Sequence, residues 1–227
     1  MGRWYLTPFL ALVLTACPGG FSPTPPTFTL GLVPSPETGG TLVSRDGRLR
    51  CGAQGDSCEV QYPKGQEVVL QAQAEPFHYF SGWEGGCSGL GDCAFTVQED
   101  TEVVGRFSPF QGNFALEVPP LVVVPLGGKV EMEVALLREG GLDVPPWAYR
   151  VELESPLVGE APDQVRVRYL PERSGPDRLV LALEGPDPAY LRRSYVQETA
   201  ALRVVLPGLE REGEFTLAVA WCGGGCP

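Results

Sequence analysis

The chain of 227 residues has a single histidine, His78. A Ser-His-Asp triad could therefore only use His78, and no nucleophile motif lies near it. The motifs Gly-x-Ser-x-Gly, His-Glu-x-x-His and the phosphate-binding P-loop are also missing. A glycosidase would need two carboxylates across a cleft, whereas acidic pairs such as Glu131 and Glu133 are spaced to share one face of a strand. We therefore expect no enzyme activity, no cofactor and no metal site. Acidic stretches at 98–102 and 183–188 could gather calcium, but we interpret them as turns.

Positive charge is also scarce. The chain has 17 Lys and Arg against 28 Asp and Glu, which gives a formal net charge of −11. Binding to a phosphate backbone needs clustered positive charge, so nucleic acid is not an expected partner. We interpret the compact basic spots as solvated strand faces and loops. These spots are the pairs Arg48/Arg50, Arg166/Arg168 and Arg192/Arg193.

The N-terminal apolar run, from Trp4 to Ala16, is too short to span a bilayer comfortably, since a spanning helix takes about 20 residues. It follows one basic residue and has the length of a signal-peptide core. An ordinary signal peptide with a chance cysteine is one interpretation. The run, however, ends in Leu-Thr-Ala-Cys, residues 14–17, which resembles the lipobox of bacterial lipoproteins.

The lipobox resemblance implies that residues 1–16 are a lipoprotein signal peptide and that Cys17 carries the lipid. Several acyl chains, such as palmitate, suffice for stable attachment to a membrane. Pro18, rather than Asp, follows the cysteine, which favours an outer-membrane or surface destination. We therefore expect a protein anchored to the cell membrane or outer membrane, facing the periplasm or the cell exterior. Residues 17–27 are rich in proline and uncharged, and they are expected to form an extended tether.

The seven cysteines are an odd number, and Cys17 accounts for the odd one. The other six fall into three tight pairs, and local disulfides are the economical interpretation for an exported chain, although sequence alone leaves other connectivities open. A structural zinc site is the alternative, but zinc ligands are usually separated by fewer residues than the cysteines of the first two pairs. The pairs are Cys51 and Cys58, Cys87 and Cys93, and Cys222 and Cys226.

Residues 28–107 have the pattern of short strands. The stretch EVVLQAQA, residues 67–74, alternates as a half-buried strand does, and glycine-containing turns separate the runs. The whole block resembles a divergent internalin-B-type repeat, a module of bacterial exported proteins. The resemblance implies a small β-grasp-like fold and a spacer or interaction role. The matching positions are Gly40, Cys51, Gly52, Cys58, Tyr62, Gly65, Phe80, Gly82, Trp83, Gly85, Cys87, Gly89, Cys93 and Phe107.

The stretch FSGWEGGCSGLGDC, Phe80 to Cys93, combines five glycines with one tryptophan and two cysteines. Phe80 and Trp83 can pack on the sheet and on a disulfide, while the glycines permit tight turns. We interpret the stretch as a structural staple. The alternative is that Trp83 is an exposed platform on which a sugar stacks.

Residues 108–113, SPFQGN, are expected to form the joint between two domains. From 112 to 221 we count about eight alternating strands at the spacing of a β-sandwich. This part resembles, more weakly, bacterial immunoglobulin-like modules, through Pro125, Gly127, Gly128, Arg138, Gly140 and Gly141. Residues 222–227 are expected to be a tail pinned by a disulfide. The predicted fold is all-β, a small β-grasp-like repeat module plus an immunoglobulin-like β-sandwich.

The sequence therefore predicts a non-enzymatic, lipid-anchored cell-envelope protein that acts as an interaction or structural display module. Its partner would be an envelope protein or a glycan. The alternative is a carbohydrate-binding accessory lipoprotein. The exposure of Trp83 and Trp147 distinguishes these two functions. If both side chains face solvent in one concave patch, sugar binding is favoured. If they are buried, the display module is favoured.

Overall fold

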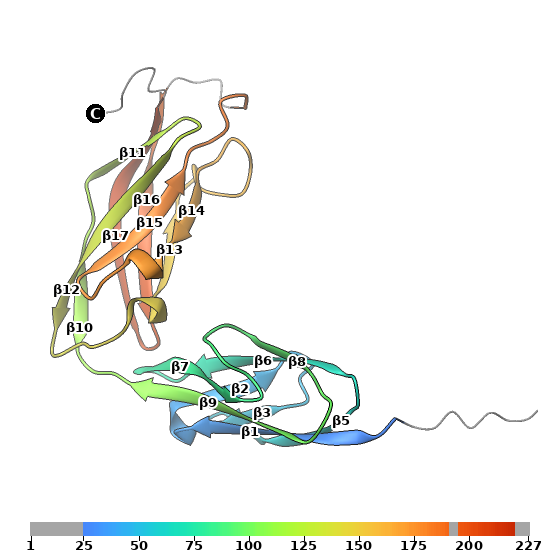
Figure 1. Cartoon of the computed structure of the whole chain (residues 1–227). Coiled ribbons are helices and arrows are strands. Elements are labelled where there is room, and N and C mark those ends of the chain that lie inside the picture. The colour runs from blue at the N-terminus through green and yellow to red at the C-terminus, as the bar shows by residue number, and fades with distance from the viewer. Residues whose placement is uncertain (1–24, 191–194, 221–227) are drawn as a thin grey trace, which may run out of the picture.

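The computed structural model describes residues 25–190 and 195–220, and within them almost all regular structure is strand (Figure 1). The expected all-β fold is confirmed. The helices among the described residues are three-residue 3-10 turns, none of which could cross a bilayer. The predicted signal peptide, Cys17, most of the tether, Cys222 and Cys226 lie outside the described residues.

The N-terminal module, residues 25–109, consists of two sheets, with strand orders β5-β1-β9-β7 and β4-β3-β2-β6-β8. In the first sheet β1 and β9 are parallel, and the other pairs of this module are antiparallel. The elements are β1 (Thr27–Ser35), η1 (Glu37–Gly39), β2 (Gly40–Ser44), β3 (Arg50–Gly52), β4 (Gly55–Ser57), β5 (Glu59–Pro63), β6 (Glu67–Ala74), β7 (His78–Gly85), β8 (Cys93–Thr96) and β9 (Thr101–Pro109).

The alternating pattern of these strands builds the core between the two sheets. Val68 and Leu70 of β6 are buried, as are Leu30 and Leu32 of β1. A β-grasp fold has a helix packed on one sheet. The sequence of this module has the period of strands, and its described part contains no helix other than the three-residue turn η1. A second sheet therefore packs on the face of the first sheet that a helix would cover.

The C-terminal module, residues 113–220, is a sandwich of two sheets with strand orders β10-β12-β15-β14 and β11-β17-β16-β13. Immunoglobulin-like domains place strands A, B, E and D in one sheet and C, F and G in the other. Taking β10 and β12–β17 as A to G reproduces this order, with β11 as a second segment of strand A that pairs in parallel with β17. The elements are β10 (Asn113–Glu117), β11 (Leu121–Pro125), β12 (Lys129–Glu139), η2 (Pro146–Ala148), β13 (Arg150–Glu154), β14 (Arg166–Tyr169), η3 (Pro171–Arg173), β15 (Arg178–Glu184), β16 (Tyr195–Leu206) and β17 (Leu209–Ala220).

Local chemistry explains how the chain changes sheets between β10 and β11. Pro119 and Pro120 occupy the crossing, and proline cannot donate to a strand ladder, so pairing stops there. Arg211 of β17 then fixes β10, because its guanidinium donates to the carbonyl oxygen of Phe114 at 3.0 Å and to the side-chain oxygen of Asn113 at 2.6 Å. The expected immunoglobulin-like sandwich is confirmed by this topology.

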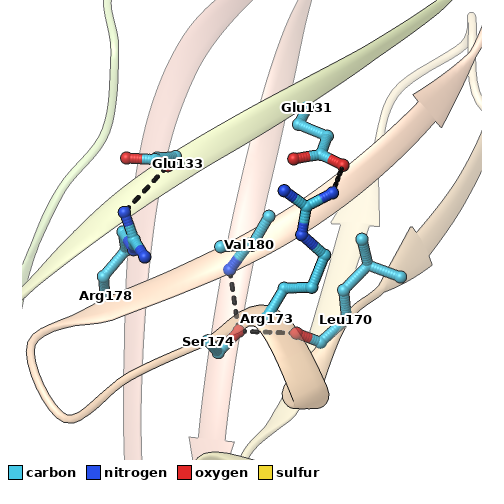
Figure 2. A network of polar contacts seen from close by, with 7 residues as sticks. All are labelled: Glu131, Glu133, Leu170, Arg173, Ser174, Arg178 and Val180. Atoms are coloured by element: carbon cyan, nitrogen blue, oxygen red, sulfur yellow. Dashed lines mark hydrogen bonds and ion pairs between the residues drawn. The ribbon is translucent and has the colours of Figure 1, made fainter.

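The outer face of the sheet β10-β12-β15-β14 carries a row of ion pairs, shown in Figure 2. Arg173 pairs with Glu131, and Arg178 pairs with Glu133 at 3.0 Å. The Ser174 hydroxyl donates to the carbonyl oxygen of Leu170 and accepts from the backbone N–H of Val180, which fixes η3 against β15. Exposed pairs of this kind contribute about 0–1 kcal/mol each, so they add little to the stability of the fold.

Candidate functional site

The stretch from Phe80 to Cys93 is a staple, and Trp83 is part of the core. The Trp83 side chain is 4% exposed, its ring centroid lies 4.9 Å from that of Phe80, and its indole N–H donates to the carbonyl oxygen of Gly91 at 2.7 Å. The structure joins Cys87 to Cys93, the pair expected from the spacing. Trp83 therefore lacks the open indole face that a sugar platform requires, and it does not share a surface with Trp147.

The second described disulfide joins Cys51 to Cys58, so the four described cysteines form two local pairs. Zinc would need their thiolates to be free, and a cysteine in a disulfide is no metal ligand. Within residues 25–190 and 195–220, no three His, Cys, Asp or Glu side chains are grouped to hold a metal ion. In the acidic stretch 98–102, Asp100 accepts from the backbone N–H of Thr29 at 2.7 Å, which gives it a structural role.

The paired carboxylates singled out in the sequence lie on strand faces. Glu131 and Glu133 are in the ion pairs of Figure 2, and the Arg203 guanidinium bridges Glu154 and Glu210. These carboxylates do not face one another across a cleft, as a glycosidase requires.

The basic residues singled out in the sequence also make local contacts or lie exposed on strands. The Arg48 guanidinium lies 4.4 Å from the centroid of the Tyr62 ring, and Arg50 donates to the carbonyl oxygen of Gln54. Arg166 pairs with Glu184 at 3.3 Å, and Arg168 is an exposed neighbour on the same strand. Arg192 and Arg193 lie outside the described residues.

The features that do converge lie at the junction of the two modules, visible where β9 leads into β10 in Figure 1. Two exposed aromatic residues lie there, Phe77 with 49% of its surface exposed and Trp147 with 40%. Phe77 packs on Phe110 with ring centroids 5.9 Å apart, and Trp147 packs edge-on against Tyr79 at 5.6 Å. The Tyr79–Trp147 contact joins the N-terminal module to the C-terminal one.

The N-terminal side of the junction is the turn between β6 and β7. Phe77 in this turn has a φ of 61°, which side chains other than glycine rarely adopt. The backbone groups of Phe77 are fully used, since its N–H donates to the carbonyl oxygen of Pro207 and its carbonyl oxygen accepts from the N–H of Phe110, both at 2.8 Å. The first of these hydrogen bonds crosses between the modules and holds the unusual backbone conformation in place.

The C-terminal side begins with the two-residue turn between β16 and β17, made of Pro207 and Gly208. Gly208 has a φ of 80°, as the second central residue of a type II turn requires. A Cβ placed on Gly208 would lie 2.9 Å from the Cβ of Pro76. The turn is therefore shaped to accept the β6–β7 turn of the other module at close range.

The loop after β12 completes the junction. Arg138 donates from its two terminal nitrogens to the carbonyl oxygens of Leu142 and Val144, at 3.0 and 2.9 Å. This clamp fixes the backbone on both sides of Asp143. The connecting Gly112 lies against the same loop, where a Cβ would approach the carbonyl oxygen of Glu139 to 2.4 Å. Arg138 therefore positions the loop that presents Asp143.

A hollow of about 440 Å³ opens at the junction, within the size range of small-molecule sites. Its walls are Tyr79, Pro109, Phe110, Gln111, Gly141 and Asp143, which come from both modules and from the connection between them. The side chains of Gln111 and Asp143 are exposed, and neither makes a hydrogen bond or an ion pair with a described residue. The hollow therefore has walls of mixed polar and apolar character, with two polar side chains that are available to a ligand.

Trp147 is held beside this hollow by a further contact. It lies in η2, and the Tyr169 hydroxyl donates to the carbonyl oxygen of Pro146 at 2.6 Å. Burial of the Tyr169 hydroxyl raises its pKa to about 12 from an ordinary value of 10.0. The hydroxyl therefore keeps its proton, and this hydrogen bond, well into the alkaline range.

Of the two tryptophans considered as binding residues, only Trp147 lies at the candidate site. The predicted joint at 108–113 contributes Pro109, Phe110 and Gln111 to the hollow. No sequence motif pointed to Phe77, Tyr79 or Asp143 as site residues, because they lie in different strands and loops. The turn-forming Gly140 and Gly141 next to Arg138 are the one local signal for the Asp143 loop.

Comparisons with known proteins add little to this geometry. No protein-family model matches the chain, and no curated protein is similar to it in sequence. Solved structures that it resembles include domains 4 and 5 of the S-layer protein SbsC, at 12% identity over 79% of this chain and 75% of that chain, with a TM-score of 0.30. They also include the full-length major pilin SpaD from Corynebacterium diphtheriae, at 7% identity over 84% of this chain and 63% of that chain, with a TM-score of 0.27. Likenesses at this level carry no argument about function, and the fold assignment rests on the strand order itself.

Proposed function

We propose that the protein is a non-enzymatic, lipid-anchored component of the cell envelope whose two β modules act together as an interaction and display unit. The observation that carries the proposal is the junction. A main-chain hydrogen bond and an aromatic contact dock one module on the other, and exposed aromatics gather there. Binding residues are often found on loops that a rigid scaffold positions.

The chemistry of the chain supports an envelope location. The two short disulfides belong in an oxidising compartment. The lipobox-like residues 14–17 supply the anchor of the proposal, through Cys17. The resemblance of residues 28–107 to an internalin-B-type repeat agrees with a spacer or interaction role outside the cytoplasm.

The anchor is tested by intact-mass spectrometry of the mature protein purified from its own envelope. We expect the chain to begin at Cys17 and to carry a diacylglycerol and a further acyl chain. Replacing Cys17→Ser should release the protein from the membrane fraction. A mature chain that begins elsewhere and carries no lipid would rule the anchor out.

The interaction role is tested by mild-detergent extraction, capture through a C-terminal tag, and mass spectrometry with glycan analysis of what is retained. We expect a near-stoichiometric protein or polysaccharide that is lost from Trp147→Ala. Tyr190→Ala is the matched control, because Tyr190 is 61% exposed and lies before β16, at the opposite end of the strand from Pro207. Retention of nothing above an untagged control, or equal retention by both variants, would contradict the role of the junction.

A further inference from the structure

The polar groups of the junction hollow restrict the chemistry of its ligand. Asp143 is a carboxylate that only accepts hydrogen bonds when ionised, and the Gln111 amide both donates and accepts. No Lys or Arg side chain is among the residues that line the hollow, and the whole chain has a net charge of −11. A ligand bearing carboxylates or phosphates would therefore meet repulsion without a compensating cation.

The apolar walls restrict the ligand further. Tyr79 and Pro109 offer apolar surface next to the two polar groups, whereas Phe110 is only 8% exposed. A proline-rich peptide would pack on such surfaces, but it presents carbonyl acceptors and few N–H donors, which leaves Asp143 without a partner. A sugar residue presents hydroxyl groups that donate and accept, together with C–H faces that pack on aromatic rings. A sugar residue therefore satisfies both kinds of wall.

The backbone at Phe77 gives an independent indication of function. A left-handed conformation costs a residue other than glycine about 1–2 kcal/mol, and such strain tends to gather at functional sites. Here it places an aromatic side chain at the junction with 49% of its surface exposed. Phe77 contacts the wall residue Phe110, and the exposed Trp147 contacts the wall residue Tyr79. The hollow therefore has an exposed aromatic side chain packed against each of two wall residues.

We infer that the junction hollow is a binding site for a neutral sugar residue of a polysaccharide, with Asp143 and Gln111 as hydrogen-bonding groups and the junction aromatics as packing surfaces. This inference rests on the proposed interaction function and names its ligand class. Because the walls come from both modules, the site exists only while the modules are docked.

The test is isothermal titration of the purified two-module protein with neutral hexasaccharides of glucose, of mannose and of N-acetylglucosamine. Hexagalacturonate and a proline-rich dodecapeptide serve as the competing ligand classes. We expect at least one neutral hexasaccharide to bind. Asp143→Ala should weaken its affinity about tenfold, as expected when a ligand loses a charged hydrogen-bonding partner. Trp147→Ala should weaken it about fivefold through lost packing.

Matched variants control for unrelated effects on the surface. Asp163→Ala removes an exposed carboxylate from the loop before β14, outside the hollow, and Tyr190→Ala removes an exposed aromatic. Both should bind as the unchanged protein does. Gln111→Ala is a second hollow variant, which alters only an exposed side chain and should also weaken binding.

Three outcomes would overturn the inference: no binding of any neutral hexasaccharide at millimolar concentration, binding that survives Asp143→Ala and Trp147→Ala, or binding of only the acidic hexasaccharide or the peptide. The proposed interaction role fails separately, when the captured native protein retains no partner that depends on the junction.

Discussion

Gly208 is the position at which a single methyl group should loosen the two modules. Its φ of 80° and its contact with the other module act together, since a Cβ there would lie 2.9 Å from the Cβ of Pro76 and 3.4 Å from the backbone nitrogen of Phe77. When an added Cβ would lie less than 3.0 Å from another heavy atom, one of the two must move. Gly208→Ala should therefore push the β6–β7 turn away and break the 2.8 Å hydrogen bond from the N–H of Phe77 to the carbonyl oxygen of Pro207.

The size of the effect follows from the contacts that cross the junction. The main-chain hydrogen bond contributes about 1 kcal/mol and the Tyr79–Trp147 ring pair about another 1 kcal/mol. Together they favour the docked arrangement about thirtyfold, because 1.4 kcal/mol is a factor of ten. Loss of the hydrogen bond would lower this preference to about fivefold.

Residual dipolar couplings of the isotopically labelled protein report directly whether the two modules are docked. In the unchanged protein, one alignment tensor should fit the amides of both modules. In Gly208→Ala the two modules should need separate tensors, because about one molecule in six is then undocked. Gly141→Ala is the matched control, since Gly141 has a φ of 78° in the same module and its added Cβ meets nothing within 4 Å.

Both variants should lower the free energy of unfolding of the C-terminal module by about 1–2 kcal/mol, since alanine is strained at a positive φ. Only Gly208→Ala should change the alignment. A docked junction would be refuted if the unchanged protein already needed two tensors, or if Gly208→Ala gave the same single tensor as Gly141→Ala.

Three further predictions concern stability. The pKa of Tyr169 is raised from 10.0 to about 12, so the contribution of its protonated hydroxyl to the free energy of unfolding is complete below pH 10 and is lost as the pH rises through 12. This contribution is no more than about 2 kcal/mol after solvent screening. Tyr169→Phe should remove this pH dependence of thermal unfolding. Replacing Cys87 and Cys93 by alanine should lower the free energy of unfolding of the N-terminal module by about 2 kcal/mol, as expected for a loop of this length, and denaturant titration would contradict this if the midpoint did not move. Leu202→Ala should lower the free energy of unfolding of the C-terminal module by about 2–5 kcal/mol, because Leu202 is fully buried. Leu137→Ala, at a position 47% exposed, should change this free energy by less than about 0.5 kcal/mol. Equal effects of the two substitutions in calorimetry would refute the core assignment.

Features that depend on neighbours in the sequence were predictable. The cysteines of the pairs 51–58 and 87–93 lie close enough along the chain for a disulfide to close a short loop, and the structure contains both bonds. Trp83 was expected in the core because glycines and a disulfide surround it, and it is 4% exposed. Alternation in 67–74 and in β12 identified strands, since successive side chains of a strand point to opposite faces.

The sequence by itself determined the acidic charge, the all-β class, the short disulfide spacing and the change of pattern near 108–113, because composition and strand period are local properties of a chain. Only the tertiary structure decided which turns meet at the junction. It brings Phe77 to Pro207 and Tyr79 to Trp147, and it places Asp143 and Gln111 on the walls of one hollow. Such contacts follow from the order of strands in the two sheets and from the docking of one module on the other, and no local pattern encodes them.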